Sequence, residues 1–450
     1  MRGTGTIAAG ILVLCMITSG CTNHEPSPPN VLVILADDLG WNQLGCYGGP
    51  YLTPAIDSLA SQGTRFTSAY ASAAVCSPTR AALMTGKYPA RLHITDFITG
   101  QAFPDSLLEQ PDWQKYLPLE EVTLAEIFKN QGYRTAFFGK WHLSQEKKPP
   151  GSEPFNPDKQ GFGEYMITYK PISGITDTGH DPHNTDSITR RSVRFLQEKG
   201  DRPFFLVVSH NAIHDPLMES QVNIDAYLDR YPEPPFPVKP EVGAMVARLD
   251  RSVSALMESL EELGLSRQTI VVFCSDNGGK EAHASQYPFR KGKGWLHEGG
   301  IRVPLIVRWP GRIVEGSRIH RVNATIDLFP TILELAGMGV PGSPDGISLA
   351  GELLGTGSPG DRALFWHYPH YHGGSGMKPA SALRSGKYKL IEWHEEYLSG
   401  EHAWELYDLE NDQGELLDLS TSYPALLDSL KRKLHGWRDE VGAQMPSLKE

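Results

Sequence analysis

Acidic side chains follow two apolar segments of this 450-residue chain, at the points where those segments end. Asp37 and Asp38 come after a β-branched run near the N-terminus, and Asp276 and Asn277 come after a similar run much later in the chain. Three carboxylates gathered at one place raise each other's pKa unless a cation is present. Oxygen donors alone suit Ca²⁺ or Mg²⁺ better than Zn²⁺, which favours His and Cys. We therefore predict a metal site here, although an Asp pair after a strand is more often a loop or helix cap.

A cysteine opens the segment Cys76–Arg80, whose sequence is Cys-Ser-Pro-Thr-Arg, and a run of small residues ending at Gly86 follows. Pro78 is tolerated if a helix begins at the cysteine, because the first helical turn leaves its N–H groups unpaired in any case. Arg80 then lies one helical turn after Cys76, so both side chains project to the same side. The plainest interpretation is a buried cysteine at the start of a helix.

Four cationic or imidazole side chains occupy segment ends and glycine-flanked turns. Lys140 and His142 follow one apolar segment, His214 follows another, and Lys293 lies in a glycine-rich stretch. Fixed positive groups stabilise negative charge that develops on a reacting anion. Most lysines are simply exposed and most single histidines are structural, so the pattern is informative only when the four residues are considered together.

Successive buried strands must position these residues. Continuous apolar runs predict strands of a central, mostly parallel sheet, because such strands are buried on both faces. In open α/β sheets, ligands bind at the carboxyl ends of the strands, where the polar residues fall. The alternation of strands and helices predicts a doubly wound α/β fold. The expected strands are 30–35, 134–138, 204–209, 269–274 and 303–309, and the expected helices are 52–63, 81–86 continuing from the Cys76 loop, 123–132 and 241–263.

The pattern changes near residue 361. Residues 381–391 and 404–409 have the composition of antiparallel strands, and residues 426–437 have the spacing of an amphipathic helix. We predict a catalytic domain at 30–360 and a small C-terminal α+β subdomain at 361–450.

The N-terminal residues resemble a bacterial lipoprotein signal. A short basic start precedes the apolar run 7–17, which is too short to span a bilayer, and Cys21 precedes a Pro-rich polar stretch. We predict a signal peptide at 1–20 and a tether at 21–29 that is lipidated on Cys21, with an ordinary secretory signal as the alternative. The protein is then exported, to the periplasm or the outer membrane, and contacts the membrane only through its lipid anchor.

Charge and cysteine content limit the partners. The formal net charge of −11 argues against nucleic acid bound by bulk charge, but a few local cations can still dominate a pocket. Of the five cysteines, Cys15 would be lost with the signal peptide. Cys46 and Cys274 could pair, but one possible pair is no disulfide framework, and we expect both to be buried free thiols.

Three segments resemble the signatures of the type I, formylglycine-dependent sulfatases, the arylsulfatase-like branch of the alkaline-phosphatase-like superfamily. Residues 74–86 are similar to the modification signature of that family, residues 132–142 to its second signature, and residues 290–304 to its Lys-Gly-x-x-x-Glu-Gly-Gly segment. The resemblance extends from about Asn30 to the chain end. It implies an alkaline-phosphatase-like fold and the activity of a sulfuric ester hydrolase.

The resemblance also implies a modification and a metal. Cys76 would be oxidised to formylglycine (3-oxoalanine) by a formylglycine-generating enzyme or an anaerobic sulfatase-maturating enzyme. The metal would be Ca²⁺, with Mg²⁺ the weaker candidate. Its ligands would be Asp37, Asp38, Asp276, Asn277 and an oxygen of modified Cys76.

Roles for the remaining residues follow from the same resemblance. A hydroxyl of the hydrated aldehyde would attack sulfur while Asp276 takes its proton. His214, with Lys293 as a second candidate, would protonate the leaving oxygen, and His142 would deprotonate the second hydroxyl to release sulfate. Arg80 would hold the hydrate, and Lys140 and Lys293 would bind the sulfate group.

A sulfated glycan, attacked by exo action at a sugar sulfate, is the predicted substrate. Candidate sugar-binding residues are Asp96, His180, His283, Trp295 and His297, and the run 367–372, which contains three histidines, is either a further part of this rim or a solvated loop. One rival is a formylglycine-dependent phosphodiesterase or phosphonate monoester hydrolase, which Asn277 in place of a histidine disfavours. The other rival is an inactive lipoprotein that binds sulfated glycans, although none of the expected site residues is missing.

Overall fold

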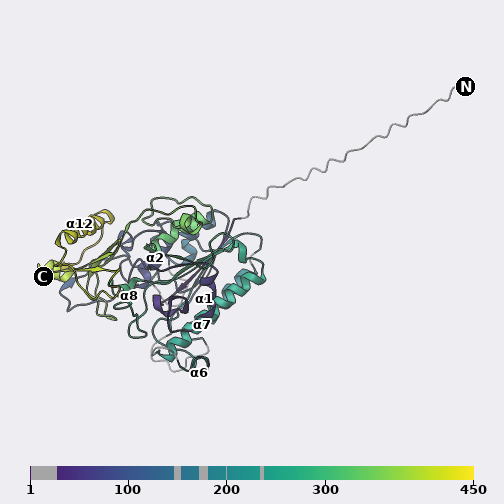
Figure 1. The fold of residues 1–450 in the computed structure, drawn as a ribbon, viewed down its shortest axis with the longest axis horizontal. Helices are drawn as coiled ribbons and strands as arrows, with labels where there is room; N and C mark the ends of the chain where they lie inside the picture. The colour runs from purple at the N-terminus through teal and green to yellow at the C-terminus, as the bar shows by residue number, and fades with distance from the viewer. Residues whose placement is uncertain (2–27, 146–153, 172–180, 199, 234–237) are drawn as a thin grey trace.

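The computed structural model describes residues 1, 28–145, 154–171, 181–198, 200–233 and 238–450 (Figure 1). The predicted signal peptide, with Cys15 and Cys21, therefore lies outside the described residues, apart from Met1. Cys46, Cys76 and Cys274 are free thiols, as expected for Cys46 and Cys274; Cys274 is buried, whereas Cys46 is partly exposed. Within the described ranges, no helix is both long and apolar enough to cross a membrane.

An eight-stranded mixed sheet forms the centre of the larger part of the molecule. Its strand order is β10-β2-β9-β8-β1-β7-β5-β6, and β8, β1, β7, β5 and β6 run parallel to one another. The strands are β1 (Asn30–Ala36), β2 (Thr64–Phe66), β5 (Arg134–Gly139), β6 (Glu164–Ile167), β7 (Phe204–Ser209), β8 (Thr269–Ser275), β9 (Leu305–Arg308) and β10 (Ser317–Ile319). The five predicted strands are all present, and β2, β6 and β10 are additional.

Strand β9 runs antiparallel to both of its neighbours, β8 and β2. Its start, and not its end, therefore lies at the sheet edge where the parallel strands finish. The segment that precedes β9 contains Lys293. The reversal of this one strand explains why a residue before a strand joins residues that follow strands.

Strand β1 shows why the sheet is buried on both faces. Val31 and Val33 pack into one hydrophobic cluster, and Leu32 and Ile34 pack into a second cluster on the opposite face. Successive side chains of a strand point to opposite faces, so a continuous apolar run fills two cores. β1 is almost fully inaccessible, and it brings Asp37 and Asp38 to the centre of the sheet edge.

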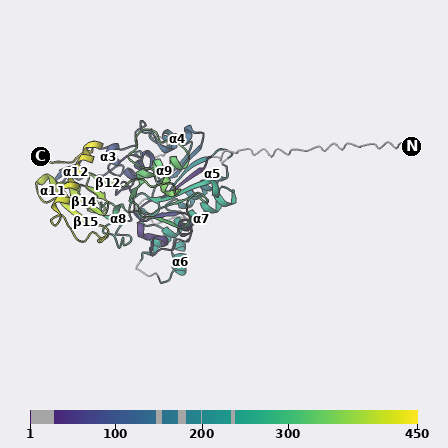
Figure 2. The ribbon, with the colours of Figure 1, turned by 45° about the horizontal axis from the view of Figure 1, so that its top comes forward.

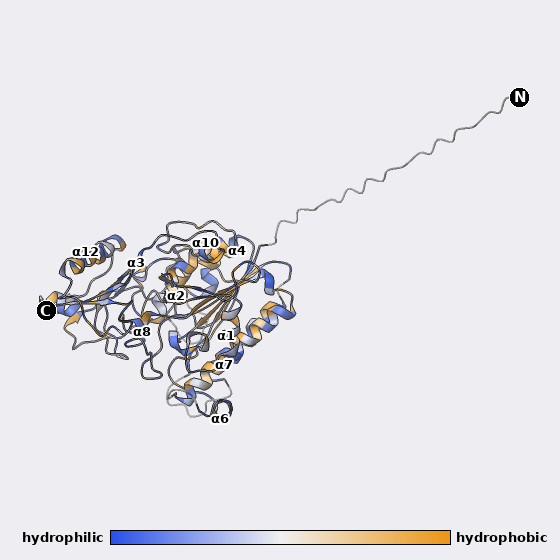
Figure 3. Ribbon diagram, in the orientation of Figure 1, coloured by the Kyte–Doolittle hydropathy of each residue, from blue (hydrophilic) through white to orange (hydrophobic). Residues whose placement is uncertain are grey.

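Helices cover both faces of the sheet. One face is covered by α2 (Cys76–Thr85), α4 (Leu124–Asn130), α9 (Leu328–Leu335) and α10 (Ala350–Leu353), and the other by α1 (Pro54–Ser61), α5 (Thr185–Gln197) and α7 (Pro240–Glu262). Helix α6 (Gln221–Arg230) packs on α7. Figure 2 shows α4 and α9 on one side of the sheet and α7 on the other, and in Figure 3 α7 carries alternating apolar and polar stripes.

Local sequence sets the helix boundaries. Thr123 and Glu126 form a reciprocal capping box, so α4 begins at Leu124; Gln131 is its C-cap, and the helix is shorter at both ends than the predicted 123–132. Pro54 and Pro240 occupy the first helical turns of α1 and α7, where proline removes no intrahelical hydrogen bond. Gly86 ends α2 in the left-handed conformation, with φ of 70°.

The C-terminal residues form a four-stranded antiparallel sheet in the order β12-β13-β14-β15. The segment predicted as a strand at 381–391 is a hairpin that turns at Gly386, whose positive φ of 58° suits a tight turn. This sheet contacts the larger part through Trp366, whose Nε1 donates to the carbonyl of Ala71 at 2.8 Å. The elements are β12 (Ala363–Tyr368), β13 (Ala380–Ser385), β14 (Tyr388–Trp393), α11 (His394–Ser399), β15 (Trp404–Asp408) and α12 (Pro424–Val441). The predicted domain boundary at residue 361 stays a prediction.

Candidate active site

Helix α2 presents Cys76 to the sheet edge. Cys76 is the first residue of the helix and is 1% exposed. Its Sγ lies 3.5 Å from Oδ1 of Asp37 and 3.5 Å from Nζ of Lys293. Burial raises the pKa of the thiol to about 12, although Lys140 and Lys293 oppose this effect. At neutral pH the unmodified thiol is therefore neutral, whereas the thiolate is the nucleophilic form of cysteine.

A group of potential metal ligands surrounds Cys76. Ligand atoms of Asp37, Asp38, Cys76 and His214 all lie within 4.8 Å of one another. Nδ2 of Asn277 donates to Asp38 at 2.8 Å, while its Oδ1 is buried with no hydrogen-bond partner among the described residues. A buried, unpaired amide oxygen beside two carboxylates fits a hard divalent cation, because such cations take oxygen ligands.

Asp276 adjoins this group but is held by Arg80. Nε and Nη2 of Arg80 donate to Oδ2 of Asp276 at 2.9 and 2.7 Å, and Nη1 donates to the Lys140 carbonyl and to Oγ of Ser209 at 2.6 Å each. Arg80 thus ties α2 to the ends of β5, β7 and β8. Burial raises the pKa of Asp276, although Arg80 opposes that effect. Oδ1 of Asp276 accepts a hydrogen bond from the Asp38 amide at 3.3 Å and remains near the candidate metal site.

Two lysines flank Cys76, and each is paired with one carboxylate. Nζ of Lys140 lies 2.8 and 2.9 Å from the two oxygens of Asp37, and Nζ of Lys293 lies 2.7 and 2.9 Å from those of Asp38. Burial alone would lower the pKa of both lysines, but the carboxylates outweigh burial and raise it. Burial would likewise raise the pKa of Asp38, but Lys293 holds it well below its usual range. Both ammonium groups are therefore charged at neutral pH.

Two histidines complete the arrangement. Nε2 of His142 bonds to the carbonyl of Ile98 at 2.6 Å, which makes Nε2 the donor; the buried Nδ1 has no partner in the part of the chain that the structure describes. Nδ1 of His214 bonds to the carbonyl of Asp215 at 2.8 Å, and its Nε2 faces Asp38 at 3.9 Å. Burial first, and then nearby lysines, hold the pKa of each histidine well below its usual value. Each imidazole is neutral at pH 7 and has one nitrogen able to accept a proton.

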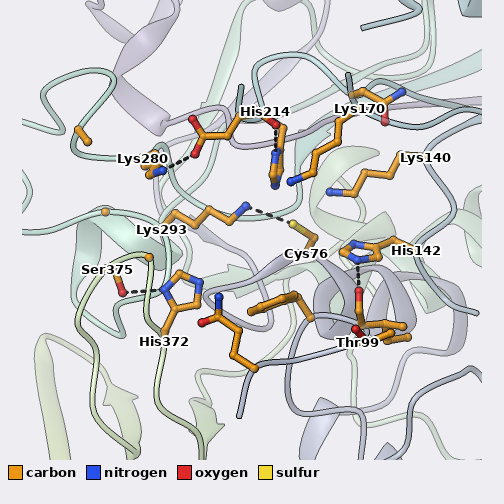
Figure 4. Close-up of a pocket in the computed structure, with 18 of the residues that line it drawn as sticks. Cys76, Thr99, Lys140, His142, Lys170, His214, Lys280, Lys293, His372 and Ser375 are labelled. Carbon is orange, nitrogen blue, oxygen red and sulfur yellow. Dashed lines mark hydrogen bonds and ion pairs between the residues drawn. The ribbon is translucent and has the colours of Figure 1, made fainter. Parts of the chain in front are cut away.

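These residues form the base of a pocket of about 730 Å³ (Figure 4). We call Cys76, Lys140, His142, His214 and Lys293 the floor, which lies over Asp37 and Asp38. Figure 4 shows the floor side chains pointing toward a common centre. We call the outer wall the rim, which comprises Phe97, Gln101, Lys170, Lys280, Trp295, His372 and Ser375. The pocket volume falls in the range of small-molecule sites.

Of the predicted sugar-binding residues, Trp295 alone is among the described residues that line the pocket. Nε1 of Trp295 donates to the carbonyl of Ser375 at 3.2 Å, which fixes the indole ring. Nε2 of His283 instead lies 2.6 Å from Oδ1 of Asp215. His297 is 1% exposed and lies beside Glu405. Neither histidine is among the described residues that line the pocket.

Asp96 is a buried support and not a part of the pocket wall. It is 1% exposed, and its Oδ1 accepts hydrogen bonds from the Tyr368 hydroxyl and the Phe97 amide, each at 2.8 Å. Asp96 thereby supports the loop that carries Phe97 into the rim. His180 lies outside the described residues.

Residues 367–372 do not form a solvated loop, and only part of this segment belongs to the rim. His367 belongs to β12 and is buried, and His370 is fully inaccessible. His372 alone among the three histidines lines the pocket, with its Nδ1 bonded to Oγ of Ser375 at 2.8 Å. Only His367 lies in β12, and His370 and His372 belong to the segment that follows it.

Sequence reasoning missed several lining residues. Thr168 and Lys170 follow β6, and Asn211 follows β7. Nδ2 of Asn211 donates to Oγ1 of Thr168 at 2.6 Å, which joins the two strand ends. The strand-end rule applied to Asn211 would have found it, whereas β6 is too short and too exposed to be recognised.

Comparison with protein families settles which family has this arrangement. A family model described as Sulfatase matches residues 29–338, which include every floor residue and both underlying aspartates. The chain belongs to the sulfatase family. A second model, described as N-sulphoglucosamine sulphohydrolase, C-terminal, matches residues 290–440. This match spans the segment of Lys293 and the C-terminal sheet.

Named relatives cover nearly the whole of this sulfatase. It is 33% identical to human arylsulfatase A over 467 residues, which covers 90% of this chain and 87% of the relative. It is 31% identical to the N-acetylgalactosamine-6-sulfatase of Canis lupus familiaris over 485 residues, covering 94% of this chain and 87% of the relative. This sulfatase is accordingly a sulfuric ester hydrolase.

Solved structures confirm the fold. The crystal structure of Ps i-CgsB is 28% identical, with a TM-score of 0.76, and covers 91% of this chain and 93% of that chain. The same protein in complex with k-i-k-neocarrahexaose gives a TM-score of 0.74, with the same identity and coverage. The predicted alkaline-phosphatase-like α/β fold with a small antiparallel sheet is confirmed.

Proposed function

We propose that this sulfatase removes sulfate from sulfated glycans by exo action, using a formylglycine at position 76 and a bound Ca²⁺. The observation that carries the proposal is the position of Cys76. It lies at the start of α2, at the base of a pocket, between two lysine–carboxylate pairs. A sulfate ester that reached this floor would meet residue 76 and two fixed ammonium groups at once.

Conversion of Cys76 to formylglycine is supported by the Cys-Ser-Pro-Thr-Arg segment and by the partners that the fold gives it. The modification would be installed by a formylglycine-generating or anaerobic sulfatase-maturating enzyme. When formed, the formylglycine hydrate supplies a hydroxyl nucleophile, and bound Ca²⁺ supplies positive charge beside it. Asp37, Asp38, Asp276 and Asn277 would hold the metal, and their oxygen donors fit Ca²⁺.

The residues of this chain would then bind the sulfate group and move protons. Lys140 and Lys293 approach residue 76 from two sides and would hold sulfate oxygens, because fixed charges are most effective where water is excluded. Asp276, oriented by Arg80, would accept a proton from residue 76. His142 would accept the second proton at its unpaired Nδ1.

Protonation of the leaving oxygen falls to His214, with Lys293 as the second candidate. Nδ1 of His214 holds the ring proton against the Asp215 carbonyl, so Nε2 must first take up a proton before it can donate one to the leaving oxygen. Lys293 has its ammonium 3.5 Å from Sγ of Cys76 and is within reach of the same oxygen. The two groups approach from different elements, which leaves room for a sugar between them.

A glycan substrate is supported by the shape and lining of the pocket. Trp295 and Phe97 offer aromatic faces at the rim, on which a sugar ring can pack. The solved complex of Ps i-CgsB contains an oligosaccharide, k-i-k-neocarrahexaose. The pocket has one reactive centre, which lies at its bottom, and this arrangement favours action on a terminal sugar.

We also propose export as a lipoprotein, with cleavage before Cys21 and anchoring in the periplasm or at the outer membrane. The support is the sequence alone, namely the basic start, the apolar run 7–17 and the Pro-rich stretch after Cys21. Metabolic labelling with a fatty-acid analogue tests this point, since Cys21→Ala would abolish the label.

Turnover of defined substrates tests the proposed function. Matured enzyme is incubated with sulfated mono- and oligosaccharides, 4-nitrophenyl sulfate and bis(4-nitrophenyl) phosphate. We expect sulfate release from sugar sulfates, and from the terminal sugar before internal ones. Hydrolysis of the phosphodiester alone would contradict the proposal.

A further inference from the structure

The charges that line the pocket divide into paired and unpaired groups. Three of the lining lysines have a carboxylate partner: Lys140 with Asp37, Lys293 with Asp38, and Lys280 with Asp215. The fourth lysine that lines the pocket is Lys170, and it has no hydrogen-bond or ion-pair partner among the described residues. Its side chain is exposed to the pocket.

The backbone around Lys170 is fixed. The amide of Thr168 donates to the carbonyl of Gly139 at 2.9 Å, and the carbonyl of Tyr169 accepts a hydrogen bond from Nδ2 of Asn184 at 2.9 Å. Lys170 therefore extends from an anchored segment at the end of β6. A cation on an anchored segment loses less conformational entropy when it binds a ligand than one on a free loop.

Lys170 points toward the floor. Figure 4 shows its ammonium group directed to the centre of the pocket, next to His214 and on the same side as Lys140. Burial, and then the charges of Lys140 and Lys293, lower the pKa of Lys170, which places it within electrostatic range of the floor. Because His214 faces the leaving oxygen in the proposed mechanism, Lys170 lies on the side where the sugar, and not the reacting sulfate, would sit.

We propose that Lys170 binds a second anionic group on the substrate, so that the preferred sugar sulfate also carries another sulfate or a carboxylate near the reacting ester. This inference rests on the proposed function and narrows its substrate class. A free ammonium group near Lys140 and Lys293 gains most from an additional anion, because the anion relieves their mutual repulsion. The sulfate on the floor already has two lysines, so the charge of Lys170 is available to a different group.

Binding measurements test this inference without turnover. Calorimetry on the full chain with Cys76→Ala compares N-acetylgalactosamine 6-sulfate with the 4,6-disulfate and with a uronate-linked disaccharide of the 6-sulfate. We expect at least one of the two dianionic sugars to bind about tenfold more tightly than the monosulfate, a difference of about 1.4 kcal/mol. The preferred dianion identifies the second group as sulfate or carboxylate. The preference should weaken as salt is added.

Substitutions assign the preference to one residue. Lys170→Gln should abolish the difference in affinity between the dianionic and monoanionic sugars, and Lys170→Arg should restore most of that difference. Lys129→Gln is the matched control, since it removes the same charge from the exposed side of α4, and it should leave the ratio unchanged. Three results would overturn the inference. The affinity ratio could be unchanged in Lys170→Gln, the affinity for all three sugars could fall equally, or none of the sugars could bind.

Activity separates this inference from the proposed function. If matured enzyme releases no sulfate from any ester, the proposed function fails, and the binding ratio still decides the role of Lys170. If matured enzyme releases sulfate but shows no preference that depends on Lys170, the proposed function stands and this inference fails. A fall of about tenfold in kcat/KM for the preferred dianionic substrate, relative to the monosulfate, is the kinetic result expected for Lys170→Gln.

Discussion

The floor and the rim of the pocket are built on different principles. Each floor lysine is paired with a buried carboxylate, and Asp37 and Asp38 are almost inaccessible to solvent. The rim contains groups from loops, including the segment between β12 and β13, and the pair that its Lys280 forms with Asp215 is open to water. Buried charges need partners in fixed geometry, whereas exposed charges can change with little cost. The comparison indicates that the floor sets the reaction and the rim sets the substrate.

The largest expected effect comes from removing the floor nucleophile. Cys76→Ala should lower kcat/KM by at least about 10⁴-fold on every sulfate ester, since loss of a nucleophile removes the whole reaction path. The fold should remain intact, because alanine fits the start of α2. Circular dichroism and an assay with 4-nitrophenyl sulfate measure both effects.

Cys46→Ala is the matched control for that experiment. Cys46 is a free thiol outside the residues that line the pocket, so the variant should keep its activity. Wild-type activity in Cys76→Ala would remove the basis for distinguishing floor from rim.

A second comparison sets one floor ion pair against one rim ion pair. Asp37→Asn leaves buried Lys140 without its partner and should lower the free energy of unfolding by roughly 3 kcal/mol. Asp215→Asn breaks the pair with Lys280, in which both side chains are about a third exposed, and also changes the contact with His283; it should cost less than about 1 kcal/mol. Urea denaturation of both variants gives the two values, and equal losses would contradict the comparison.

Trp295→Ala should affect the substrate and not the reaction. Loss of the indole face should raise KM for sulfated oligosaccharides about fivefold, equivalent to about 1 kcal/mol of aromatic contact. kcat should change little, because Trp295 lies on the rim. Steady-state kinetics on one oligosaccharide measures both parameters, and a fall in kcat with constant KM would place Trp295 with the floor.

The smallest effect concerns a carboxylate behind the rim. Asp96 has no cationic partner among the described residues, so burial raises its pKa to about 7. The folded protein then holds a proton that the unfolded chain releases, and this group makes stability fall as pH rises from about 4 to about 7. The free energy of unfolding of the wild type and of Asp96→Asn is measured across this pH range. Relative to the variant, the free energy of unfolding of the wild type should fall by up to about 1.4 kcal/mol for each pH unit. Parallel curves for the two proteins would contradict this prediction.

The floor was more predictable from the sequence than the rim, for physical reasons. Lys140 of the floor, and Asp37 and Asp276 next to the floor, follow buried strands. The strong apolar pattern of these strands is visible in the sequence. Lys170 follows β6, whose four residues are all partly exposed and carry no such pattern. His283 and His297 were predicted for the rim, but they lie beside Asp215 and Glu405, and no local signal in the sequence shows those long-range contacts.

The central claim is that the floor works through a modified residue 76. Mass spectrometry of the tryptic peptide 66–80, from protein made with and without a maturating enzyme, measures the fraction of Cys76 converted to the aldehyde. We predict that sulfatase activity rises in proportion to that fraction and is absent when Cys76 remains a thiol. Full activity in a preparation whose peptide carries only unmodified cysteine would contradict the account.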